Sequence, residues 1–70
     1  MQTKYAIHIF WSDEDEGFIA ICDEFKGLSA FGETREDALR EAQIALDAII
    51  ETYRSGGIEL PQPQQILQAA

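Results

Sequence analysis

Four consecutive carboxylate side chains are the residues of this sequence whose type most suggests chemistry: Asp13, Glu14, Asp15 and Glu16. Carboxylates that converge around two divalent ions can promote hydrolysis of a phosphodiester. Acids at consecutive positions of one loop project in divergent directions, however, whereas a two-metal site draws its carboxylates from separate elements. We therefore interpret the run as a solvated turn whose summed negative charge attracts a basic partner.

His8 and Cys22 are the only imidazole and the only thiol of the chain. Histidine can act as a general base near neutral pH, but no serine, cysteine or acid lies at a diagnostic spacing from His8, so we interpret it as a structural residue on the more open face of a sheet. Asp23 and Glu24 disfavour a thiolate at Cys22, which predicts an inert buried thiol. The chain also lacks a second cysteine for a disulfide and enough His and Cys for a tetrahedral zinc site. We expect no catalytic residue, no metal and no cofactor.

Charge and length narrow the class of protein further. The 70 residues include 5 Lys and Arg against 13 Asp and Glu, a net charge of −8, so direct nucleic-acid binding is not expected and a basic protein is the better partner. The length allows one domain, and 46% hydrophobic residues predict that it folds. The longest apolar run, Phe18–Cys22, is far too short to span a membrane. No secretory signal is visible, so a cytoplasmic protein is expected.

Three segments have the alternating apolar, β-branched and aromatic character of strands: residues 4–11, 18–22 and 28–31. In the first, Tyr5, Ile7, Ile9 and Trp11 share one side, and Ala6, His8 and Phe10 share the other. Gly17 follows the acidic run and can adopt the positive φ of a hairpin loop. The pattern predicts a three-stranded antiparallel meander.

One long helix is predicted from Thr34 to Ser55. Thr34 and Asp37 form a shortened capping box, and Gly56 and Gly57 supply a left-handed C-terminal cap. The side predicted to face the core carries Leu39, Ala42, Ala45, Leu46, Ile49, Ile50 and Tyr53. On the opposite side, Ile44 and Ala48 form an apolar spot flanked by Glu41 and Glu51, which either is ordinary surface or contacts a partner.

Residues 58–60 are expected to add a short edge strand, since Pro61 and Pro63 lack amide donors and exclude a central position. The predicted fold is therefore α+β, in the order β-β-β-α-β. We assign residues 1–60 to one domain and residues 61–70 to an extended tail rich in proline and glutamine. A chain this small without a disulfide or metal is expected to gain burial as a homodimer or higher homo-oligomer.

The order of these motifs resembles the HicB family of antitoxins from toxin–antitoxin systems. The resemblance is carried by Gly17-Phe18 after the acidic turn, Phe25-Lys26-Gly27, Gly32-Glu33-Thr34, Glu36-Asp37-Ala38 and the closing Leu60-Pro61-Gln62-Pro63. Lys26 and Asp23 stand where the family often has proline. The resemblance covers nearly the whole chain and corresponds to the family's N-terminal domain, so we expect no DNA-binding domain of the kind that members often carry.

The resemblance implies a degraded RNase H-like fold and a function without catalysis. The expected partner is a basic HicA-type toxin that cleaves mRNA, with the antitoxin covering the active site of the toxin. The toxin-binding residues proposed from the sequence are Asp13, Glu14, Asp15, Glu16, Ile44 and Ala48. Two alternatives remain open at this stage: an orphan domain with a regulatory or structural partner, and a residual metal-dependent nuclease on the RNase H-like scaffold.

Overall fold

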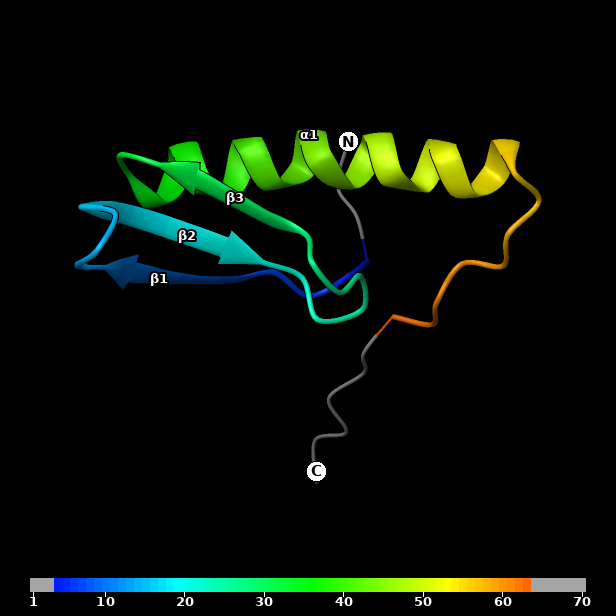
Figure 1. Cartoon of the computed structure of the whole chain (residues 1–70), viewed down its shortest axis with the longest axis horizontal. Coiled ribbons are helices and arrows are strands. Elements are labelled where there is room, and N and C mark those ends of the chain that lie inside the picture. Colours follow the sequence, from blue (N-terminus) through cyan, green and yellow to red (C-terminus); the bar gives the residue numbers. More distant parts are fainter. Residues whose placement is uncertain (1–3, 64–70) are drawn as a thin grey trace, which may run out of the picture.

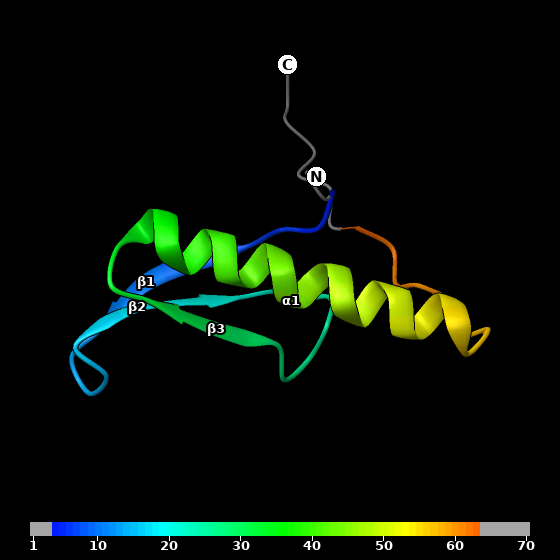
Figure 2. The same ribbon diagram turned by 90° about the horizontal axis from the view of Figure 1, so that it is seen from above.

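The structure is a computed structural model that describes residues 4–63 of the chain. Its elements follow the order β1 (His8–Ser12), β2 (Gly17–Ile21), β3 (Ser29–Gly32) and α1 (Arg35–Ser55). The three strands form an antiparallel sheet in the order β1-β2-β3, and α1 lies across one face of it (Figures 1 and 2). The predicted α+β class, the antiparallel meander and the long helix are confirmed.

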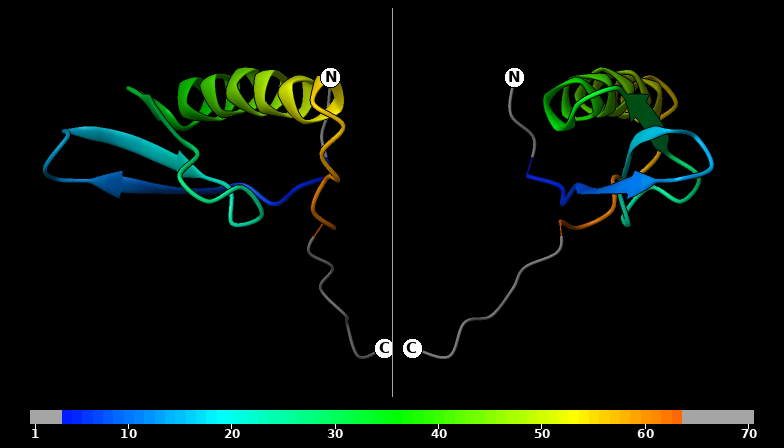
Figure 3. Two further views of the ribbon diagram at one scale, coloured as in Figure 1. Left: turned by 45° about the vertical axis from the view of Figure 1, so that its right-hand side comes forward. Right: turned by 90° about the vertical axis from the view of Figure 1, so that its left-hand side faces the viewer.

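The two sides predicted for the first strand are confirmed by what each packs against, although β1 spans His8–Ser12 and not residues 4–11. Ile7 and Ile9 contact a buried cluster of Ala20, Ala38 and Ala42 between the sheet and α1. His8 and Phe10 are exposed on the opposite face of the sheet. Viewed along α1, the helix covers one face, and none of the described helices or strands covers the other (Figure 3). The described part of the molecule therefore has two layers, with one sheet face open.

The core is built from small residues where α1 begins and from large residues where it ends. Beyond the alanine cluster, a second cluster contains Cys22, Phe25 and Leu46, each at most 3% exposed. Tyr5 and Tyr53 meet the ring of Phe25 edge-on, at centroid distances of 4.9 and 5.4 Å. These edge-to-face contacts add to the free energy gained by burying the three rings.

The helix contacts the core through a slightly different set of residues from the predicted one. Ala38, Ala42 and Leu46 are the buried positions of α1, whereas Leu39 is 36% exposed. The prediction that Leu39 faces the core is therefore wrong. Ala38 takes that place, since it is fully buried and its backbone packs closely against Gly32 of β3. Among described residues, no helix is long and apolar enough to cross a membrane.

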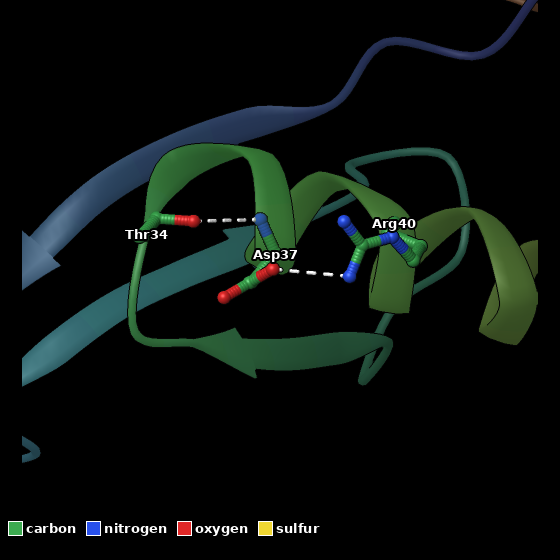
Figure 4. Close-up of polar contacts among 3 residues, drawn as sticks. All are labelled: Thr34, Asp37 and Arg40. Carbon is green, nitrogen blue, oxygen red and sulfur yellow. Dashed lines mark hydrogen bonds and ion pairs between the residues drawn. The ribbon is translucent and has the colours of Figure 1, made fainter.

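Both predicted caps of α1 are formed. The Thr34 hydroxyl accepts a hydrogen bond from the Asp37 amide at 3.0 Å (Figure 4). The reciprocal half of the capping box is absent, since the Asp37 carboxylate instead accepts from Arg40 at 3.0 Å (Figure 4). At the other end Gly57 has φ of +67°, and the amides of Gly57 and Ile58 donate to the carbonyls of Arg54 and Tyr53. This is a Schellman motif.

Two local predictions are corrected by the structure. Residues 58–60 form no strand, because the amide of Ile58 is used in the helix cap and Pro61 has no amide to donate. The left-handed residue of the hairpin is Glu16, with φ of +53°, and Gly17 belongs to β2 opposite Ser12. Within the predicted tail, the Pro61 carbonyl accepts a hydrogen bond from the Tyr5 hydroxyl at 2.7 Å. Residues 64–70 lie outside the described part of the chain.

Gly32 is the point of closest approach between the sheet and the helix. A Cβ atom at this position would meet the backbone nitrogen of Ala38 and lie 2.7 Å from its Cα atom. Backbone atoms in the first turn of α1 cannot move aside without displacing the helix. The structure therefore requires glycine at residue 32 for steric reasons.

We expect Gly32→Ala to lower the free energy of unfolding by about 3 kcal/mol, the upper end of the usual cost of overpacking. Gly56→Ala is the matched control, because Gly56 has φ of −87° and a Cβ there would lie 3.4 Å from its nearest neighbour, the Thr52 carbonyl oxygen. The control should change the free energy by less than about 1 kcal/mol. Urea denaturation of both variants measures the difference, and equal losses would contradict the close approach.

Candidate functional site

The predicted acidic residues form the turn between β1 and β2. All four side chains, Asp13 to Glu16, are exposed. The turn lies at the end of the molecule where α1 begins, and the hairpin extends past the start of the helix (Figure 1). The structure thus confirms the predicted place of the run in a solvated hairpin turn.

The turn has an internal hydrogen-bond network that involves only two of its four carboxylates. Asp15 accepts a hydrogen bond from the Ser12 hydroxyl at 2.8 Å, and Asp13 accepts one from the indole N–H of Trp11 at 2.7 Å. Glu14 and Glu16 form no hydrogen bond or ion pair with other described residues. Asp13 and Asp15 therefore help to shape the turn, while Glu14 and Glu16 are available to a partner.

Trp11 is a surface residue of this site that the sequence interpretation placed among core-facing residues. Its indole is 52% exposed and meets the ring of Phe18 edge-on at 5.2 Å. The guanidinium of Arg35 lies over the ring of Phe18, 4.8 Å from its centre. The sequence signal that could have identified Trp11 is its position at the end of the predicted strand over residues 4–11, directly before the charged turn.

The second predicted surface lies on the outer side of α1. Ile44 is 57% exposed, and Ala48 one turn later is also exposed. The exposed acids Glu41, Asp47 and Glu51 surround them on the same helix. Ile44 lies in the middle of α1, whereas the acidic turn lies beyond the N-terminal end of the helix (Figure 2). The predicted residues therefore form two separate surfaces.

His8 is paired with an acid that the sequence interpretation did not assign to it. Its Nε2 atom lies 3.0 Å from a carboxylate oxygen of Asp23, and both side chains are about half exposed. A histidine held by an acid is one part of a nucleophilic site. Among residues 4–63 no hydroxyl or thiol is hydrogen-bonded to His8, so the pair connects the start of β1 to the turn after β2 without a nucleophile.

Cys22 lies in the core, 3% exposed, and its thiol points toward a carboxylate oxygen of Glu24 at 3.5 Å. Burial raises the pKa of the Cys22 thiol, and the nearby Glu24 carboxylate adds to that rise. The thiol is therefore poorly reactive, as the sequence predicted, although burial contributes more than charge. Across the described residues, no three side chains of His, Cys, Asp or Glu gather in a way that could hold a metal ion.

Comparison with known families identifies the chain. A family model described as the HicB-like antitoxin of bacterial toxin–antitoxin systems matches residues 4–69. No curated protein and no solved structure matches significantly. Since the family match covers nearly the whole sequence, including both predicted surfaces, the chain belongs to the HicB-like antitoxin family of bacterial toxin–antitoxin systems.

Proposed function

We propose that this chain binds a small basic toxin of the HicA type and neutralises it by covering the surface that binds and cleaves mRNA. The observation that carries this proposal is the match to an antitoxin family over residues 4–69. Membership in that family implies a toxin partner of some kind. The type of toxin and the way it is masked are our inference, as is the RNase H-like origin of the fold.

The charge of the chain supports masking of an RNA-binding surface. A protein that binds RNA presents lysine and arginine side chains to the phosphates. A chain with a net charge of −8 competes for the same positive surface and is attracted to it over a distance of about one Debye length, ~8 Å at physiological salt. Complementary charge increases the association rate more than it increases the lifetime of the complex.

We assign the first contact with the toxin to the acidic turn. Its four exposed carboxylates lie at one end of the molecule, so a basic surface can approach them without obstruction from α1. Trp11 beside the turn offers a half-exposed aromatic ring, a side-chain type enriched among residues that dominate binding energy. A lysine or arginine of the toxin can stack on this ring and pair with Glu14 or Glu16 at once.

The apolar spot of Ile44 and Ala48 is the proposed second contact. A large aliphatic side chain with 57% exposure gains free energy when a partner covers it. The acids around it provide a polar rim of the same sign as the turn. A toxin that reaches both surfaces would extend from the hairpin end to the middle of α1.

The proposed function predicts that the purified chain suppresses RNA cleavage by a HicA-type toxin encoded in the same genome. Cleavage of a labelled mRNA fragment should fall to background near an equimolar ratio, because the antitoxin occupies the site that the RNA needs. The chain alone, with Mg²⁺ or Mn²⁺, should cleave neither RNA nor DNA. Undiminished toxin activity in excess chain would point to an orphan domain, and cleavage by the chain alone would point to a nuclease.

A second prediction concerns how the acidic turn acts. Replacing Asp13, Glu14, Asp15 and Glu16 by the matching amides removes four charges, and the amide oxygens can still accept the two hydrogen bonds of the turn. The free energy of unfolding should therefore change little. The association rate with the toxin, measured by stopped flow, should fall roughly tenfold or more at low salt, and the defect should shrink as salt rises.

Ile44→Asp provides the contrast, because it should accelerate dissociation by burying a charge in the packed contact. Replacing only Glu14 and Glu16 by glutamine provides a cleaner control, since neither side chain takes part in the hydrogen bonds of the turn. An association rate that is unaffected by the quadruple change would show that the acidic turn is an ordinary solvated loop and does not attract the toxin.

A further inference from the structure

The face of the sheet opposite α1 carries a continuous apolar row. Phe10 on β1 lies opposite Ile19 on β2, and Ile19 lies opposite Phe31 on β3. Phe10 is 46% exposed and Phe31 is 45% exposed. No described helix or strand lies over them (Figure 3). Sheets in folded domains bury their apolar face against another layer, and among residues 4–63 no helix or strand supplies that layer for this row.

Phe31 is held in position by its neighbour across the sheet. A Cβ atom at Gly17 would overlap the ring of Phe31, so the ring lies directly over the glycine. An aromatic ring that covers a strand glycine in this way supports the pairing of the two strands. Because the ring is already fixed before binding, covering it costs little side-chain entropy.

We propose that a second copy of this chain covers the row, with the two sheets packed face to face. The inference does not depend on the identity of the toxin. The small size of the chain predicts a homodimer, and we place its interface on the open face of the sheet. The acidic turn and the outer side of α1 then remain free for another partner.

The charge on this face favours a second copy over a basic protein. The strand residues that share the face with the row are His8, Ser12, Gly17, Ile21 and Ser29. None of them is acidic, although the Asp23 carboxylate reaches this face beside His8, 3.0 Å from its Nε2 atom. Two chains with a net charge of −8 each repel one another, so they can associate only where both surfaces are nearly neutral. A basic protein gains more from the acidic surfaces elsewhere on the molecule.

The row is also complementary to itself. If a two-fold axis runs parallel to β2 between two stacked sheets, Ile19 packs against Ile19 of the other chain. Phe10 of each chain then packs against Phe31 of the other. Contacts between identical surfaces must be self-complementary in this way. A row with a large aromatic residue on each side of a central β-branched residue satisfies that condition.

The size of the face sets the expected affinity. Three strands about 4.8 Å apart, with about 3.4 Å per residue, give a sheet of roughly 15 by 17 Å. This is less than the ~800 Å² per partner of a typical stable interface. We therefore expect a dimer that forms in the micromolar range and dissociates on dilution.

Sedimentation equilibrium of the full chain, from a few micromolar to several hundred micromolar, tests the proposal. The apparent mass should rise with concentration from 7.9 kDa toward twice that value. Phe10→Asp should weaken association at least tenfold by placing a carboxylate against Phe31 of the other chain. Ile44→Asp is the matched control, since it adds the same charge at a similarly exposed apolar residue of α1, and it should associate like the wild type.

A wild-type chain that stays at 7.9 kDa throughout, or a folded Phe10→Asp variant that associates normally, would overturn the proposal. If Phe10→Asp does not fold, wild-type chain mixed from ¹³C-labelled and unlabelled copies decides the question by isotope-filtered NMR. Contacts between chains should then join Ile19 to Ile19 and Phe10 to Phe31. Contacts between chains only through α1 would place the dimer elsewhere and contradict the proposal, while leaving the toxin-binding function intact.

Discussion

The close approach of α1 to the sheet is the constraint on which the rest of the structure depends. Small residues make it possible: Gly32 on β3, Ala20 on β2, and Ala38 and Ala42 on α1. A larger side chain at any of these positions would push the helix away from the strands. Farther along α1, Leu46 packs with Phe25 and fills a wider space. The core therefore changes from small to large residues along the helix, and this gradient fixes how α1 crosses the sheet.

Because α1 packs on one face of the sheet, three other surfaces of the described residues remain exposed. The hairpin extends past the start of the helix and presents the acidic turn. The outer side of α1 presents Ile44 among acids, and the open sheet face presents Phe10 and Phe31. These surfaces differ in chemistry, because the first two are rich in carboxylates and the third is mainly apolar. We propose that this small domain uses them to contact a basic partner and a copy of itself at different sites.

Much of this fold could be predicted from the sequence because its signals are local. Alternation identified the strands and their buried side, and Thr34 with Gly57 marked the ends of α1. The misses concern tertiary packing. Phe25 lies between two turns, yet it is among the most buried side chains, at 2% exposed. Its loop contains a turn from Phe25 to Leu28 in which Gly27 has φ of +86°, and the second position of such a turn accepts Lys26 as well as the proline that the HicB resemblance led us to expect. The acidic turn was predictable as a run of charge, whereas the pairing of His8 with Asp23 and the row across β1, β2 and β3 depend on strand register.

We propose that a toxin contacts the hairpin turn and the outer side of α1, whereas the sheet face buried under α1 is structural. Amide chemical shifts of the ¹⁵N-labelled chain, followed during titration with a catalytically inactive HicA-type toxin, test this most directly. We expect the largest changes at residues 13–16 and around Ile44, with the amides of Ala20 and Ala38 almost unchanged. Changes confined to the open sheet face or to the loop at residues 22–28 would contradict it.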